Sequence, residues 1–267
     1  MIEQTAFLYK YKAIDGDNGD NFKWAGRIFT HNEIYFANAN DFNDPFDCKF
    51  DFSFDGSNQD RKDYLIKYVK DRHPNWNREC RNTWIAKNFS NFSWDDPDFI
   101  NRVKESNKKL ILTVRICSFS EVPDDILMWS HYANGHQGFC LQFSGNEDTD
   151  FIANGPFNKR EQKISYSDTY PIVNRFKDSD METLKKSLLT KAKRWEYEKE
   201  WRMIDHKKGP DIKRFSPEML VGVIFGCRMT EENQGQIREW CANRKTKISF
   251  YKAQEETQSY SLKIIGA

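Results

Sequence analysis

The sequence predicts an α+β fold with a mainly antiparallel sheet, and three observations lead to this prediction. Segments with the two-residue period of strands open and close the chain, segments with helical period are inserted between them, and no regular strand–helix alternation favours a parallel sheet. The 267 residues include 38 % apolar and 15 % aromatic residues, enough to bury a large core. We expect a single domain spanning residues 1–267, with a helical insertion at 58–109.

The first fifty residues are predicted to form strands separated by turns. FLYKY at 7–11 and IYFA at 34–37 have strand composition, and a loop rich in Gly, Asp and Asn at 15–21 lies between them. From Phe46 to Phe54, phenylalanine or cysteine alternates with polar residues. This alternation predicts a half-buried strand.

Helical periodicity begins after residue 57. Tyr64, Leu65, Tyr68 and Val69 fall on one face of a predicted helix. The Asp-Asp-Pro cluster at 95–97 is typical of the start of a second helix. This segment forms the predicted insertion, and we expect it to bind an acceptor or a protein partner.

Strand patterns return after residue 109. The predicted strands share apolar runs bounded by turn residues, and they lie at 110–119, 138–143, 163–167, 219–226, 248–251 and 259–265. A short helix is expected at 128–132. A longer helix is expected from about Met181, capped by Ser179 or Asp180, with an apolar face that continues to Ala192 and Trp195.

Composition indicates which binding partners and which cellular location to expect. The chain has 41 basic and 40 acidic residues, a formal charge of +1, so no global field favours nucleic acid or an anionic membrane. Its six cysteines include no CxxC pair, and we expect them to be reduced thiols. The first residues lack the apolar stretch of a signal peptide, and no apolar run is long enough to cross a bilayer. We therefore expect a cytoplasmic protein with no membrane partner.

The segment WEYEKEWR at 195–202 carries three closely spaced carboxylates. If residues 197–204 form a strand, Glu196, Glu198, Glu200 and Arg202 share one face. Neighbouring carboxylates repel each other, so a buried cluster needs a cation, solvent or a substrate that uses it. The alternative is a continued helix whose glutamates form a solvated face.

Two further polar segments are candidates for a site. NDPFDC at 43–48 is a strong turn signal, and its Asn43 and Asp44 either shape a structural turn or face a ligand. A predicted strand ends with Ser118 and Ser120, which leaves two hydroxyl groups at a sheet edge.

Several common catalytic and metal-binding motifs are absent. His131, His136 and Cys140 suggest zinc, but their spacing matches no usual zinc finger, and we expect no metal site. The sequence has no GxxxxGK[ST], GxGxxG, HExxH or GxSxG motif. These absences exclude P-loop enzymes, Rossmann dehydrogenases, zincins and the common serine hydrolases.

The chain resembles a bacterial family known only as domain of unknown function 2971. The resemblance rests on LYKY, FNDPFDC, CSFSE with LMWSHYANGHQGFCLQF, WEYEKEWR and VGVIFGCRM, which occur in this order. It spans nearly the whole chain, and the helical insertion is its least similar part.

The order of these segments also resembles the ADP-ribosyltransferase superfamily, with its split, mainly antiparallel sheet. This resemblance implies that Lys10 on the first strand contacts NAD, that Ser118 and Ser120 brace the nicotinamide pocket, and that Glu200, the second Glu of Glu-x-Glu, is catalytic. Lys10 stands where Arg or His is usual. Glu198 would orient the acceptor, and Tyr9, Asn43 and Asp44 are further candidates for the NAD site.

The implied activity is transfer of ADP-ribose from NAD to a macromolecule, either nucleic acid (RNA or DNA) or protein. The resemblance also implies the setting of a toxin or phage-defence effector, with an antitoxin or other regulatory protein as partner. The basic run KAKR at 191–194 would suit a nucleic-acid acceptor.

Two other classes of function remain open from the sequence. A divalent-metal phosphodiesterase or nuclease could use Asp44, Asp47, Glu198 and Glu200 as oxygen ligands. A non-catalytic module could bind a ligand at the same place without turnover.

Overall fold

The chain divides into two compact units in a computed structural model that describes residues 7–14, 19–144, 163–205 and 212–267. The first unit comprises Met1–Phe42, Val114–Tyr166 and Lys193–Ala267, and the second comprises Asn43–Thr113 and Ser167–Ala192. The helical segment predicted at 58–109 falls within the second unit, which also takes in the chain on both sides of it and residues 167–192.

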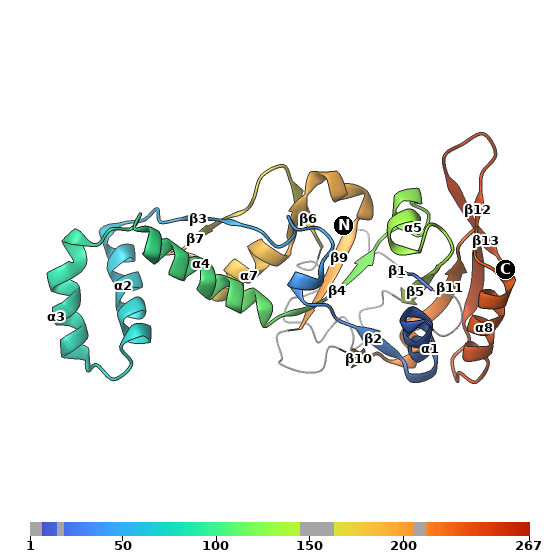
Figure 1. Ribbon diagram of the computed structural model, residues 1–267, viewed down its shortest axis with the longest axis horizontal. Helices are drawn as coiled ribbons and strands as arrows, with labels where there is room; N and C mark the ends of the chain where they lie inside the picture. The colour runs from blue at the N-terminus through green and yellow to red at the C-terminus, as the bar shows by residue number, and fades with distance from the viewer. Residues whose placement is uncertain (1–6, 15–18, 145–162, 206–211) are drawn as a thin grey trace, which may run out of the picture. The chain divides into compact units, whose positions relative to one another are not determined.

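A seven-stranded sheet forms the centre of the first unit, in the order β13-β12-β11-β5-β1-β4-β9 (Figure 1). The strands are β1 (Phe7–Lys12), β4 (Arg115–Ser120), β5 (Phe139–Ser144), β9 (Glu200–Asp205), β11 (Leu220–Phe225), β12 (Ser249–Glu255) and β13 (Leu262–Gly266). Among these described strands, β11 and β12 pair in parallel and the other neighbours are antiparallel. The prediction of an α+β fold with a mainly antiparallel sheet is confirmed.

The remaining described elements of the first unit connect or cover this sheet. They are α1 (Asp20–His31), α5 (Ile126–Tyr132), α8 (Glu231–Ala242), the paired short strands β2 (Glu33–Tyr35) and β10 (Ile212–Arg214), and the 3-10 helices η1 (Ala39–Asp41), η4 (Lys193–Glu198) and η5 (Pro217–Met219). The short strand β6 (Ser165–Ser167) contains the point in the sequence, between Tyr166 and Ser167, where the first unit ends and the second resumes. The short helix predicted at 128–132 corresponds to α5.

The helix α1 corrects the expectation of strands and turns alone in the first fifty residues. Ala25, Ile28 and Phe29 are buried at the spacing of one helical face. The helix ends where Asn32 adopts a left-handed conformation (φ 55°) and donates its N–H to the carbonyl oxygen of Arg27. Of the predicted loop at 15–21, residues 15–18 lie outside the described residues.

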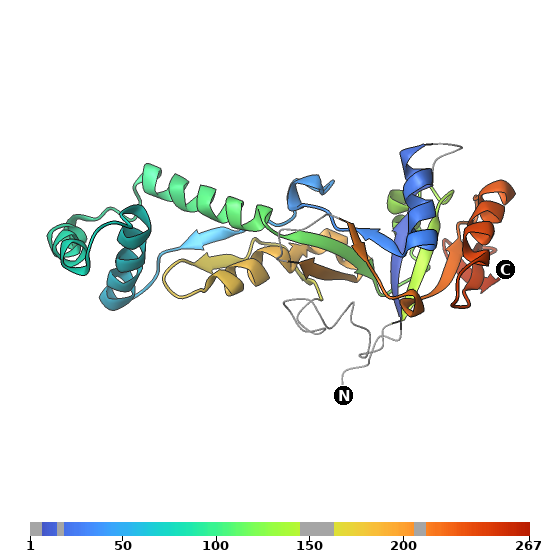
Figure 2. The same cartoon turned by 90° about the horizontal axis from the view of Figure 1, so that it is seen from below.

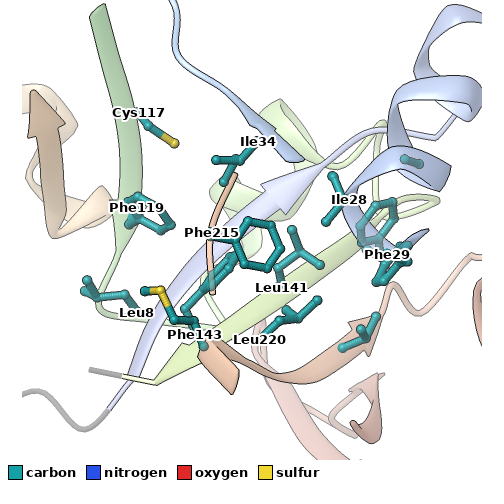
Figure 3. Close-up of a cluster of buried hydrophobic side chains, with 14 of the residues drawn as sticks. Leu8, Ile28, Phe29, Ile34, Cys117, Phe119, Leu141, Phe143, Phe215 and Leu220 are labelled. Carbon is teal, nitrogen blue, oxygen red and sulfur yellow. The ribbon is translucent and has the colours of Figure 1, made fainter. Parts of the chain in front are cut away.

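The main core lies on one face of the sheet, where α1 and α8 lie side by side (Figure 1 and Figure 2). Figure 3 shows apolar side chains from α1, β1, β4, β5 and β11 gathered into one cluster that includes Leu8, Phe29, Phe119, Leu141 and Phe143. A second cluster lies on the other face, beneath α5, and is built around Tyr11, Trp129, Cys140 and Ile224. Both faces of the sheet are therefore covered.

The second unit is mainly helical (Figure 1). Its elements are α2 (Asn58–Arg72), α3 (Arg78–Asn88), α4 (Pro97–Leu112), α7 (Asp180–Leu188), the 3-10 helix η2 (Phe89–Asn91), the parallel pair β3 (Asp51–Ser53) and β7 (Ile172–Asn174), and β8 (Thr190–Ala192). Side-chain caps start its helices: Ser57 and Asp60 form a capping box on α2, and Asp96 caps α4 ahead of Pro97.

Two helix boundaries differ from the prediction. The helix α7 begins after its cap Ser179, as expected, but ends at Leu188, so Ala192 and Trp195 do not lie on its apolar face. The predicted strand at 110–119 is helical up to Leu112, because this stretch continues the apolar face of α4 through Ile111.

The predicted strand from Phe46 to Phe54 is largely wrong. Only Asp51–Ser53 pairs as a strand, and Phe46 is 65 % exposed. The carboxylates of Asp44 and Asp47 accept backbone N–H groups from their own turn, and Cys48 has a positive φ of 58°. These local bonds bend the chain where alternation alone predicts an extended strand.

No helix in the described part of the chain has the length and apolar character needed to cross a membrane.

We expect Gly138→Ala to destabilise the protein. A Cβ atom at this position would lie 2.2 Å from the backbone oxygen of Lys12, and backbone cannot rotate away as a side chain can. Overpacking of this kind costs roughly 1–3 kcal/mol. Thermal or denaturant unfolding measures the loss.

The matched control is Gly235→Ala, which lies within α8 and would meet no atom within 4 Å. This change should stabilise the protein by about 0.5–1 kcal/mol, since alanine has the better helix propensity. Equal effects of the two substitutions would contradict the close approach at Gly138.

Candidate functional site

A row of polar side chains crosses the face of the sheet opposite the main core. Leu8, Phe119 and Trp201 point into that core, so their strand neighbours point to the other face. The register places Tyr9 opposite Ser120, and Ser120 opposite Glu200. Gln142 lies opposite Tyr9 on the other side and donates from Nε2 to the Tyr9 hydroxyl at 3.3 Å. We call Gln142, Tyr9, Ser120 and Glu200 the polar row.

Glu200 is buried in an ion pair. It is 3 % exposed, and its carboxylate contacts Arg202, which is fully buried: Nε to Oε1 is 2.7 Å and Nη2 to Oε2 is 3.1 Å. The Glu200 backbone N–H donates to the Tyr166 hydroxyl at 2.8 Å. Burial raises the pKa of Tyr166, with the charge of Glu200 among the further causes, so this hydroxyl stays neutral beside the carboxylate.

Glu198 is the second buried carboxylate, also 3 % exposed. Its Oε1 accepts a hydrogen bond from the Tyr132 hydroxyl at 2.7 Å, and its backbone oxygen accepts one from the Ser120 hydroxyl at 2.6 Å. Glu198 ends η4, and Lys199 then turns the chain into β9 with a positive φ of 42°. Ser120 thus connects both glutamates, one by its hydroxyl and the other by strand register.

Of the strand considered at 197–204, residues from Glu200 on form β9, whereas Tyr197 and Glu198 belong to the end of η4. Glu196, on η4, is exposed and does not join the buried pair. The alternative of a continued helix with a solvated charged face is wrong, because Glu198 and Glu200 are buried and the chain is a strand from Glu200 on. The carboxylate cluster therefore has two members.

An aromatic group adjoins Glu198. The ring of Trp195 lies 6.0 Å from that of Tyr197 and 6.2 Å from that of His131. Burial, followed by the charge of Glu198, raises the pKa of Tyr197 to about 12. Lys193 and Arg194, just before Trp195, are exposed.

Lys10 lies on the opposite face of the sheet from the polar row. Its Nζ donates to the Ser118 backbone oxygen at 2.8 Å and lies 5.4 Å from the centre of the Phe119 ring, which belongs to the main core. On the same side, burial and then the charge of Lys10 lower the pKa of Lys12 to about 8, and burial raises the pKa of Cys117. Of the two candidates on this strand, Tyr9 and not Lys10 shares a face with Glu200.

Ser118 also faces the side of the polar row. It is half-buried and lies opposite Arg202 in the pairing of β4 with β9. Both predicted serines therefore neighbour the Glu200–Arg202 pair.

Asn43 and Asp44 belong to the second unit. Asp44 shapes its own turn: its Oδ1 accepts the Phe46 N–H at 2.8 Å and its backbone oxygen accepts the Asp47 N–H at 3.2 Å. Asn43 is exposed. The side chains of Asp47 and Lys191 are buried together, with Oδ2 and Nζ 3.8 Å apart, so the first lysine of the KAKR run is not on the surface.

The histidines and cysteine considered for zinc have separate surroundings. Cys140 is fully buried in the cluster beneath α5, His131 is exposed, and His136 Nε2 is 3.1 Å from the Ser130 hydroxyl. Among the described residues, no three His, Cys, Asp or Glu side chains are grouped in a way that could hold a metal ion. All six cysteines are free.

Three side chains of this site were not singled out from the sequence: Gln142, Tyr132 and Tyr166. Each contacts the site through a tertiary hydrogen bond, so no local pattern marks it. One indication for Tyr132 was available from the sequence, its place in the predicted short helix at 128–132.

One family comparison bears on this site. Residues 128–203 match the family model described as a protein of unknown function, DUF2971. The matched segment contains Tyr132, Gln142, Glu198, Glu200 and Arg202, and the match supports the resemblance to that family. No match to the chain was found among curated proteins or among solved structures.

We expect Glu200→Gln to lower the free energy of unfolding by roughly 3 kcal/mol, because it removes the negative charge that two nitrogens of the buried Arg202 contact. Glu196→Gln is the matched control on the exposed part of the same segment, and its effect should stay within about 0.5 kcal/mol. Urea unfolding of both variants checks the difference. Equal losses in the two variants would show that the Glu200–Arg202 contact does not contribute to the free energy of unfolding beyond an exposed charge.

We expect Lys12→Met to stabilise the protein at neutral pH and to lose this advantage at higher pH. An unfolded lysine has a pKa of about 10.4, whereas that of Lys12 in the folded protein is about 8. Below pH 8 the wild type keeps a buried charge, which disfavours folding. Between the two pKa values the folded protein releases the proton and the unfolded chain retains it, so wild-type stability rises with pH.

Unfolding curves of wild type and Lys12→Met at pH 7 and near pH 10 test this expectation. Lys23→Met, at an exposed position of α1, is the control and should show a difference from wild type that does not depend on pH in this way. An advantage of Lys12→Met that is unchanged at high pH would contradict the lowered pKa.

Proposed function

We propose that this protein is a NAD-dependent ADP-ribosyltransferase of the split-sheet type, with its reaction site at the polar row. The supporting observation is the convergence of Tyr9, Ser120, Glu198 and Glu200 from three distant parts of the sequence. Two buried carboxylates beside a serine strand are the arrangement that the resemblance to this superfamily implies.

In the proposed reaction, the bond between the nicotinamide nitrogen and ribose C1 breaks. The bonding electrons leave with nicotinamide, which is neutral after departure and needs no general acid. Positive charge develops on the ribose, as in glycoside cleavage. The carboxylate of Glu200 faces this charge and stabilises the transition state, and Arg202 holds that carboxylate in position.

Glu198 acts on the acceptor. Its carboxylate takes the proton from the attacking group as that group bonds to ribose C1. The Tyr132 hydroxyl fixes its orientation, and Ser120 holds the backbone between the two glutamates. Tyr132 and Ser120 are thus positioning residues in this proposal.

In this proposal Tyr9, and not Lys10, is the residue of the first strand that contacts NAD, because Tyr9 lies on the same face of the sheet as Glu200. Ser118, beside Arg202, lines the same face. Asp44 is left out of the proposed NAD site, because its carboxylate accepts a hydrogen bond within its own turn. Its exposed neighbour Asn43 is left out with it.

The acceptor in this proposal is a macromolecule. The exposed Lys193 and Arg194 precede Trp195 and Tyr197, and basic and aromatic side chains in this order suit the phosphates and bases of a single-stranded nucleic acid. A cytoplasmic toxin or phage-defence effector, held in check by an antitoxin or other regulatory protein, is the setting that the resemblance implies.

We expect Glu200→Gln to lower NAD turnover on the order of 100- to 1,000-fold, the scale for loss of a main electrostatic stabiliser. NAD should still bind, since this contact matters most in the transition state. Glu198→Gln should reduce ADP-ribose incorporation more than NAD hydrolysis, because its proposed partner is the acceptor. Glu196→Gln should keep wild-type values.

The assay follows labelled NAD with separate pools of RNA, DNA and protein, using variants whose folded state is verified by circular dichroism. Wild-type turnover in folded Glu200→Gln would refute the assignment of Glu200. Activity that needs a divalent cation and no NAD would instead favour a phosphodiesterase.

A further inference from the structure

The second unit contains a pocket of about 530 Å³ between the β3 region and the start of α4. This volume is within the range of roughly 300–1,000 Å³ that is typical of small-ligand sites. Four aromatic side chains line it, and they are Phe52, Phe54, Phe92 and Trp94. None of them belongs to the site at the polar row.

The aromatic rings of this pocket form a partly open surface. The rings of Phe92 and Trp94 are 4.6 Å apart, and those of Phe54 and Trp94 are 6.3 Å apart. Behind them, the fully buried Phe99 contacts both Phe54 and Trp94, at 5.4 and 5.9 Å between ring centres. The four lining rings are only half-buried.

Acidic side chains dominate the charge of the lining. Asp51 and Asp95 are both exposed at the pocket. The Ser93 hydroxyl donates to Asp95 at 2.6 Å, and this hydrogen bond lowers the pKa of Asp95, which is therefore ionised at neutral pH. Among the described residues that line the pocket, Lys104 is the one cation.

This combination favours a cationic ligand. The faces of aromatic rings carry negative electrostatic potential and attract cations, and the two carboxylates add to this attraction. A nucleic acid would also stack on the rings, but its phosphates would meet the two carboxylates. Of the cationic side chains, the planar guanidinium of arginine both stacks on rings and pairs with carboxylates, whereas the ammonium of lysine is compact and strongly hydrated.

We propose that this pocket binds an arginine side chain of a partner protein, with the guanidinium against the aromatic rings and its N–H groups directed at Asp51 and Asp95. The binding does not depend on the reaction proposed for the polar row. It gives the helical unit a recognition role of its own.

The test uses the full chain and two blocked tripeptides, acetyl-Gly-Arg-Gly-amide and its citrulline counterpart, which keeps the shape of arginine without the charge. Chemical shifts of the tryptophan indole N–H groups in ¹⁵N-labelled protein report binding. The arginine peptide should bind at least about tenfold more tightly, because citrulline forms neither the cation–π contact nor the ion pairs.

Asp51→Asn and Asp95→Asn should each weaken binding of the arginine peptide by about threefold, the scale of an exposed ion pair. Both positions are on the surface, so the fold should be retained. Trp94→Leu should weaken binding by about fivefold through loss of the ring face. Asp98→Asn is the matched control, because Asp98 is an exposed acid on the first turn of α4 that does not line the pocket.

Three results would overturn the proposal. The first is equal affinity for the arginine and citrulline peptides, and the second is wild-type affinity in both Asp51→Asn and Asp95→Asn. The third is absence of shifts with the arginine peptide at millimolar concentration. Displacement of the arginine peptide by a nucleoside monophosphate that binds more tightly would identify a nucleotide site instead.

Discussion

The antiparallel register between β4 and β9 is the constraint on which the candidate site depends. It places Ser120 opposite Glu200 and Ser118 opposite Arg202. A shift of one residue would turn Trp201 and Met203 away from the main core and turn Glu200 and Arg202 into it. Packing of the main core requires Trp201 and Met203 on its side of the sheet and excludes Glu200 and Arg202 from it. The position of the polar row therefore follows from core packing.

Removing these charges from water is costly, and contacts with their neighbours offset part of this cost. Arg202 and Glu200 satisfy each other through two contacts, but a buried ion pair seldom stabilises more than apolar residues of the same size would. Glu198 has the Tyr132 hydroxyl as a neutral donor. Two buried carboxylates two residues apart, one at the end of η4 and one at the start of β9, are the reason for placing the candidate site here.

The sequence predicted the elements whose apolar residues recur at the period of a strand or helix packed against a core. β1, β5, β11 and the final pair of strands were found close to their true positions, because their apolar residues alternate or cluster at strand length. The helix α1 was missed because its start lies in a run rich in Gly, Asp and Asn, which locally favours a turn. Its stability comes from packing of Phe22 and Phe29 against Trp240, a contact more than 200 residues away in sequence.

The candidate site was predictable in part for a similar reason. Glu198 and Glu200 share a short motif, so their proximity could be inferred, and both serines occupy one strand. The face of Lys10 could not be inferred, because its strand has apolar or aromatic residues on both sides, Leu8 on one and Tyr9 and Tyr11 on the other. Only the tertiary structure shows that the lysines accompany Leu8. The sequence also left open whether the NDPFDC segment shapes a turn or faces a ligand. The hydrogen bond that Asp44 accepts from the Phe46 N–H shows that Asp44 shapes the turn.

Ser120 gives the polar row its rigidity. Its hydroxyl donates to the Glu198 backbone oxygen and accepts the Val122 N–H, while its backbone lies in register with both Tyr9 and Glu200. The left-handed conformation of Lys199 lies between these two attachments, so the backbone spacing of Glu198 and Glu200 cannot change without breaking strand pairing or a buried hydrogen bond. In a site of low exposure, electrostatic stabilisation depends on groups that are already oriented before the reaction, since little solvent is present to rearrange. Ser120 holds the backbone of both glutamates, and Tyr132 and Arg202 orient their carboxylates.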